Sequence, residues 1–164
     1  MNDSATIEGL VVAELFGPDG ELKARCEVRN LVTAVGDQMY AARGAGITSP
    51  PNAPTGMKLG TGSTAVSKTG AGAALVTYLT GSNHAFDSTY PQAAAGVATY
   101  RVTWAAGEAT TASAITEIVI VNETLANSTS TAANTAARAL LTGIPSKAAG
   151  DSLQVTWTHT ILGA

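Results

Sequence analysis

Leu153-Gln-Val-Thr-Trp-Thr-His-Thr-Ile161 decides the fold of this chain, because its side chains alternate between the two sides of an extended backbone. One side carries a mainly apolar set, whose members are Leu153, Val155, Trp157, His159 and Ile161. The other side carries only glutamine and threonine, at Gln154, Thr156, Thr158 and Thr160. A period of two over this length is typical of a half-buried strand, so the stretch predicts a sheet protein.

Further strand-like segments precede this one, and turn residues separate them. The sequence predicts strands at residues 6–16, 21–30, 57–60, 97–105, 114–122, 135–143 and 152–162. Residues 74–80 fit a strand or a helical turn, and residues 82–96 fit an edge strand with a long turn or an exposed loop. About eight short strands without β-α-β alternation favour an all-β sandwich, jelly-roll-like or immunoglobulin-like, in one domain over residues 1–164.

Residues 6–29 predict an N-terminal β-hairpin. The apolar run Leu10-Val-Val-Ala13 on its first strand indicates burial on both faces. Gly17-Pro-Asp-Gly20 suits a type I turn. The second strand alternates, with Cys26 among the inward-facing residues and a charged outer side that includes Lys23, Arg25 and Arg29. Such charges protect an exposed sheet edge from unwanted pairing.

The period changes after Asn30. Apolar residues at Val32, Val35, Met39 and Ala42 follow helical spacing, which predicts one short helix over about residues 33–43. Thr33 or Asn30 is the expected N-cap, and Gly44 is the expected end.

Later in the chain, apolar and polar segments lead to different expectations. The run Ile118-Val-Ile-Val121 predicts a central strand covered on both faces. Residues 61–74 and 122–135 are mostly Gly, Ala, Ser, Thr and Asn. With little to bury, these two segments are expected to be loops that order against neighbouring subunits.

Composition favours a subunit of an assembly. Of the 164 residues, 45% are hydrophobic and only 13% are charged, whereas about 25% charged residues is usual. A low-charge secreted β-domain is the other interpretation, but aromatic residues make up only 5%, and a core of small apolar residues is stabilised by assembly. The net charge of −3 gives no basic surface for nucleic acid.

The chain shows none of the sequence signals of a secreted or membrane protein. A single cysteine, Cys26, rules out an internal disulfide framework. Residues 1–6 lack the features of a signal peptide, and no apolar run approaches the ~20 residues that a transmembrane helix needs. We therefore expect a soluble protein made in a cytoplasm, without membrane contact.

Candidate reactive residues do not form a catalytic pattern. Of the two histidines, His159 is expected in the core or at an interface, and His84 in a polar loop. No histidine, cysteine or carboxylate follows a metal-ligand spacing, so we expect neither a metal nor a cofactor. Cys26 is expected to be a small buried hydrophobe, because a nucleophile needs a base and an exposed setting. The chain is therefore not expected to be an enzyme.

Three further features have structural interpretations. Gly60-Thr-Gly-Ser63 lacks the Gly-Lys-Ser/Thr ending of a phosphate loop and predicts a plain turn. Nothing places Glu108 and Glu117 at a shared cleft, as a pair of acid–base carboxylates would require. Glu117 is unusual on an apolar strand, so we expect it to pair with an arginine such as Arg101 or Arg138, or to lie at a subunit contact.

Several short motifs together resemble a known family. They are Asn30-Leu-Val-Thr-Ala-Val-Gly36, Met57-Lys-Leu-Gly-Thr-Gly62, Ala106-Gly-Glu-Ala-Thr110, Ile115-Thr-Glu-Ile-Val-Ile-Val-Asn122, Ala137-Arg-Ala-Leu140-Leu141 and Ala149-Gly-Asp-Ser-Leu-Gln-Val-Thr-Trp157. In this order they resemble small β-rich virion proteins of tailed bacteriophages, which include capsid decoration (cement) proteins and tail or fibre components. The resemblance covers most of residues 30–162 and leaves out the first hairpin. It implies a structural role and no catalytic residues.

The resemblance implies a decoration protein of the virion, made in the host bacterial cytoplasm, that stabilises the head by bridging major capsid subunits. A homotrimer is expected, since several modest contacts made together give strong attachment. One alternative is a tail, collar or fibre-base component that binds tail proteins. Another is a carbohydrate-binding sandwich that stacks sugars on Phe86, Tyr90 and Tyr78. Candidate partner contacts are Lys23, Arg25, Arg29, Phe86 and Tyr90.

Overall fold

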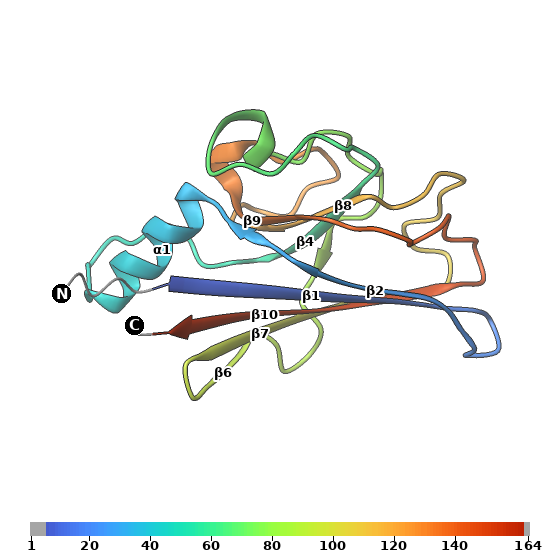
Figure 1. Cartoon of the computed structure of the whole chain (residues 1–164), viewed down its shortest axis with the longest axis horizontal. Helices are drawn as coiled ribbons and strands as arrows, with labels where there is room; N and C mark the ends of the chain where they lie inside the picture. Colours follow the sequence, from blue (N-terminus) through green and yellow to red (C-terminus); the bar gives the residue numbers. More distant parts are fainter. Residues whose placement is uncertain (1–5, 163–164) are drawn as a thin grey trace.

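A computed structural model describes residues 6–162 and contains two antiparallel five-stranded sheets that pack face to face (Figure 1). The first sheet has the order β2-β1-β10-β7-β6, with bounds Leu22–Arg29, Thr6–Phe16, Ser152–Leu162, Val97–Trp104 and Gln92–Ala94. The second sheet has the order β3-β9-β8-β4-β5, with bounds Leu31–Val32, Thr135–Leu140, Glu117–Val121, Gly56–Gly60 and His84–Ala85. The expected all-β sandwich with one helix is confirmed. The strands number ten in this part of the chain because β3, β5 and β6 are too short to show a period.

Strands β1 and β10 form the spine of the first sheet. They pair along their whole lengths, from Thr6 opposite Leu162 to Phe16 opposite Ser152. The inward side chains of β10 are fully buried up to His159, as its alternation predicts. The expectation that β1 is buried on both faces is wrong, because Val11 is buried but Leu10 is 38% exposed. No other part of the described chain covers the outer side of β1.

The helix α1 spans Ala34–Gly44, close to the expected range, and lies at one end of the sandwich (Figure 1). Thr33 caps it, since its Oγ1 accepts a hydrogen bond from the Gly36 backbone N–H at 3.2 Å. Met39 and Ala42 point into the core. Gly36 allows close packing, because a Cβ there would overlap the Ala136 carbonyl of β9.

The second sheet is covered on both sides. All five residues of β8 are buried, as its apolar run predicts. On the side away from the first sheet, Val119 and Val121 pack against Leu75, with Tyr78 and Leu125 beside them. The covering segments are residues 61–83 and 122–134, which include the 3-10 helices η1 (Gly70–Ala73) and η2 (Ala132–Asn134). These loops pack on their own sheet, so no neighbouring subunit is needed to order them.

The main core lies between the two sheets. Its largest apolar side chains are Trp104 and Trp157, and aliphatic residues from both sheets fill the space around them. At the α1 end this core also holds polar groups, including His159, which is 1% exposed. His159 therefore lies in the core.

Candidate functional site

The first sheet turns one broad surface to the outside, which we call the outer face. Its side chains lie in rows across the strands: Leu10 stands between Arg29 on β2 and Thr158 on β10, and Thr158 stands beside Thr99 on β7. All are exposed or half-buried. Its members are Glu8, Leu10, Val12 and Glu14 of β1, Arg25, Glu27 and Arg29 of β2, Gln154, Thr156, Thr158 and Thr160 of β10, and Thr99, Arg101 and Thr103 of β7.

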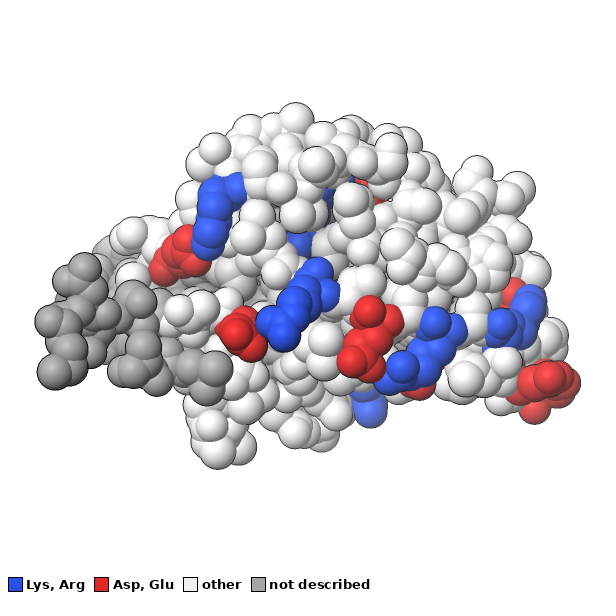
Figure 2. Space-filling view, in the orientation of Figure 1, with Lys and Arg blue, Asp and Glu red and all other residues white. Residues whose placement is uncertain are grey.

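Charges of both signs alternate along the β1–β2 side of this face (Figure 2). Arg25 contacts Glu27 at 2.9 Å and Glu14 at 3.4 Å, and Arg29 contacts Glu8 at 3.4 Å. Exposed pairs of this kind contribute little to stability. They leave the face close to neutral, which suits a protein partner better than a polyanion.

Lys23 differs from the other two cations proposed as partner contacts. Its Nζ lies 2.8 Å from Oδ2 of Asp151, whose side chain is only 1% exposed. The hydrogen bond from Lys23 lowers the pKa of Asp151, and a second hydrogen bond from the Ala148 N–H acts in the same direction. Lys23 therefore supports the β1–β2 end of the fold, whereas Arg25 and Arg29 stand on the outer face.

The structure separates the three aromatic residues of the carbohydrate-binding alternative. The Tyr90 ring stacks on the Arg101 guanidinium at 4.6 Å, next to the outer face. Phe86 turns the other way and packs on Tyr100 of the core, with ring centroids 5.2 Å apart. Tyr78 lies over the second sheet. Sequence proximity grouped Phe86 with Tyr90, but a turn at Ser88 and Thr89, where Thr89 has a φ of 75°, lies between them, so their side chains point to different places.

Asp87 fixes the segment that carries Tyr90. Its carboxylate accepts hydrogen bonds from Arg101 Nε at 2.8 Å, Thr103 N at 2.9 Å and Thr103 Oγ1 at 2.8 Å. Burial alone would raise the pKa of Asp87, but the hydrogen bonds from Thr103 and Arg101 outweigh it and lower that pKa. The contacts bind this segment to β7 and hold Tyr90 over Arg101.

A buried ion pair holds the loops that cover the second sheet. Glu117 pairs with Arg138, which is one of the two partners that the sequence suggested, and both side chains are fully buried. The Glu117 carboxylate also accepts hydrogen bonds from the backbone N–H groups of Gly62 at 3.0 Å and Thr77 at 2.7 Å. Arg138 Nη1 donates to the Thr64 carbonyl at 2.7 Å. The pair thus stabilises the fold rather than a subunit contact.

Two buried lysines were not predicted from the sequence. Lys58 is fully buried and its Nζ lies 2.7 Å from Glu123 Oε1. Lys147 is fully buried as well, and its Nζ donates to three backbone carbonyls, those of Ala105, Glu108 and Asp151, at 2.6–2.9 Å. Burial lowers the pKa of Lys147. Lysine side chains at strand and loop positions are normally exposed, so the burial of these two could not be predicted from the sequence.

The residues with potential chemistry do not converge on one place. Cys26 is 7% exposed, and burial raises the pKa of its thiol, so it is a poor nucleophile. His84 Nε2 lies 3.6 Å from Glu108 Oε2 at the surface. Within residues 6–162 there is no group of three or more His, Cys, Asp or Glu side chains placed to hold a metal ion.

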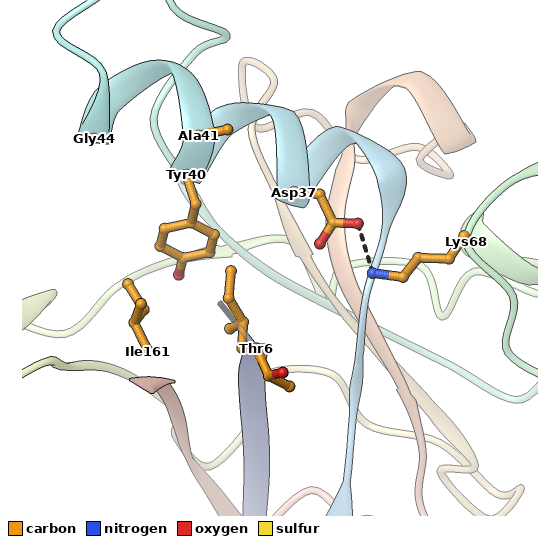
Figure 3. Close-up of a pocket in the computed structure, with 8 residues that line it drawn as sticks. Thr6, Asp37, Tyr40, Ala41, Gly44, Lys68 and Ile161 are labelled. Carbon is orange, nitrogen blue, oxygen red and sulfur yellow. Dashed lines mark hydrogen bonds and ion pairs between the residues drawn. The ribbon is translucent and has the colours of Figure 1, made fainter. Parts of the chain in front are cut away.

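A groove of about 530 Å³ lies between α1 and the end of the first sheet (Figure 3). Its apolar lining comes from Ile7, Tyr40, Ala41, Gly44 and Ile161, and its polar lining includes the exposed ion pair of Asp37 with Lys68 at 2.6 Å. The lining residues come from segments far apart in the sequence, so no local pattern could predict it. With one neutralised ion pair and no paired acid and base, the groove offers no evident chemistry.

Among the described residues, none of the helices has the length and apolar character needed to cross a membrane. Comparison of the chain with protein-family models, with curated proteins and with solved structures finds no match.

Proposed function

We propose that this protein is a structural subunit of a tailed-bacteriophage virion and that it decorates the capsid by binding the major capsid protein. One observation carries the proposal: the two sheets are covered unequally. The second sheet lies beneath its own loops, whereas the described residues leave the outer face of the first sheet open across β2, β1 and β10 and contact it only at Arg101 and Thr103 of β7. The sequence motifs that resemble phage virion proteins support the same role.

The composition of the outer face suits a protein partner. Threonines occupy its centre on β10 and β7, and paired charges occupy its β2 side. Such a surface buries modest apolar area without leaving an unpaired charge, which is usual for an interface that forms after folding. Strong attachment to the capsid then requires several copies that bind together, and a homotrimer that bridges neighbouring capsid subunits would supply this avidity.

A tail, collar or fibre-base component would use the same face on a different partner, so the alternatives differ in what they bind. The carbohydrate-binding alternative has less support, because Phe86 faces the core and Tyr90 is already stacked on Arg101. Neither catalysis nor a cofactor is needed for any of these roles.

Co-sedimentation with tail-less phage heads, stripped of accessory proteins, tests the proposal. Saturable binding at a fixed ratio to the major capsid subunit is the expected result, and the ratio gives the copy number. No binding to heads, together with binding to purified tails, would replace the decoration role by the tail role.

A matched pair of variants tests the surface itself. Thr158→Arg places a long cation in the centre of the outer face, and Ala112→Arg places the same side chain in an exposed loop. We expect Thr158→Arg to abolish co-sedimentation and Ala112→Arg to leave it unchanged. Equal binding by both variants would exclude the outer face as the contact.

A further inference from the structure

Four polar side chains meet inside the core where α1 closes the end of the sandwich. His159 of β10 lies at their centre, with Nδ1 2.6 Å from the Tyr40 hydroxyl of α1 and Nε2 3.1 Å from the Asn30 amide nitrogen. The Tyr40 hydroxyl lies 2.9 Å from the Tyr100 hydroxyl of β7. Asn30 stands where the chain crosses from β2 to β3. The cluster therefore joins the helix, the first sheet and the crossover between the sheets.

The hydrogen bonds fit a neutral imidazole. A neutral ring has one donor and one acceptor nitrogen, and here Nε2 accepts from Asn30 while Nδ1 donates to Tyr40. A second proton on the ring would turn Nε2 into a donor that faces another donor. The amide oxygen of Asn30 is buried without a partner on the other side, against Gly9, where a Cβ would overlap it.

Among residues 6–162, no side chain that faces His159 can neutralise an added positive charge. From α1 it meets Tyr40, from β7 Tyr100 and from its own strand the edge of Trp157, while Gly9 stands opposite on β1. Burial raises the pKa of both tyrosines, so they stay neutral, and the charge of Arg43 of α1, which acts on Tyr100, is itself positive. Burial alone lowers the pKa of His159 from 6.5 to about 4.

The helix α1 is the element that can move away from this cluster. Strand β10 pairs with β1 on one side and with β7 on the other, so it is fixed. The helix has 11 residues, of which only Gly36, Met39 and Ala42 are buried, and the groove opens along its Ala41–Gly44 side. Tyr40 points from α1 toward the sheet end beside Ile161 and Thr6 (Figure 3).

We propose that His159 is an acid-sensitive latch for α1: its protonation puts a charge into the core and a donor against the Asn30 amide nitrogen, and the helix that covers it is released while both sheets stay paired. Once released, His159 meets water and regains an ordinary affinity for protons. The helix is thus held fully above pH 6.5, and this hold is lost as the pH falls toward about 4. The difference between the two pKa values, 6.5 for a free and about 4 for the buried His159, limits the acid-induced rise in the ratio of released to bound helix to roughly 300-fold.

Amide hydrogen exchange of the full chain at about pH 7 and at about pH 4, corrected for intrinsic rates, tests the latch. We expect the protection of the α1 amides to fall by at least about tenfold, with the β8 and β9 amides unchanged. His159→Gln keeps a neutral amide at the centre and should remove the fall. His84→Gln replaces the surface histidine, and the fall in α1 protection should persist in this variant. A fall that persists in His159→Gln, or one that is equal in β8 and β9, would overturn the proposal, as would full protection of α1 in the wild type at about pH 4.

A second variant keeps the test sharp if His159→Gln folds poorly. Tyr40→Phe removes the helix side of the latch but leaves His159 able to titrate. We expect its α1 amides to be less protected than those of the wild type already at about pH 7. Unchanged α1 protection at about pH 7 in Tyr40→Phe would show that Tyr40 does not hold the helix.

Discussion

Arg138 and Glu117 form a fully buried ion pair between neighbouring strands, with Nη2 of the arginine 2.7 Å from Oε2 of the glutamate. Each partner also binds backbone groups of the loops above the second sheet. This arrangement explains how long segments of small polar residues stay ordered on the protein's own surface. Charged side chains supply the hydrogen bonds, and a few apolar residues such as Leu75 supply the packing.

Arg138→Met should destabilise the protein by about 3–5 kcal/mol, because it leaves the Glu117 carboxylate buried without a counter-charge. Urea unfolding followed by tryptophan fluorescence measures the loss. Arg29→Met, which breaks an exposed pair, is the control and should cost about 0.5 kcal/mol or less. Adding Glu117→Gln to Arg138→Met should recover part of the loss; a further large loss would contradict the interpretation.

The two glycines of α1 should respond oppositely to alanine. Gly36→Ala should destabilise the protein, because the new methyl group would overlap the Ala136 carbonyl. Gly44→Ala meets nothing within 4 Å, so the better helix propensity of alanine should leave stability equal or higher by up to about 1 kcal/mol. Thermal unfolding of both variants measures the contrast. If Gly36→Ala were as stable as Gly44→Ala, α1 would not pack closely on β9.

Lys23→Glu should lower the melting temperature more than Arg29→Glu does, because only Lys23 pairs with a buried carboxylate, that of Asp151. The hydrogen bond from Lys23 lowers the pKa of Asp151 below its usual 3.8. The contribution to stability is therefore complete above pH 3.8 and is lost as the pH falls through the lowered pKa. Melting curves down to about pH 2 should show this acid loss in the wild type and a smaller one in Asp151→Asn.

Attachment to capsids should depend on the sign of charge along β2. Reversing Arg25 and Arg29 together would add acidic groups beside Glu8, Glu14 and Glu27 and make this side of the outer face strongly negative. We expect weaker co-sedimentation with stripped heads, with more weakening at low salt because screening is then less effective. Undiminished attachment of this variant would remove the hairpin from the contact surface.

The sequence predicts β10 well because one side of that strand is buried and the other is not, which is what alternation reports. It misleads for Leu10 on β1, because an apolar residue in a strand does not show whether its side of the sheet is covered. Glu117 was recognisable as a charge among apolar neighbours, yet the choice between Arg101 and Arg138 depended on strand order. The different directions of Phe86 and Tyr90 depended on the turn between them, which the hydrophobic pattern does not show.

The pairing of Thr6 with Leu162 has a mechanical consequence. A load that pulls these two residues apart would peel β1 from β10 one hydrogen-bonded pair at a time, which needs little force. A load applied between Phe16 and Leu162 would act along the strands and strain all the pairs together. Tethers placed at these two pairs of positions in a single-molecule pulling experiment would therefore find a weak direction and a strong one in the same sheet.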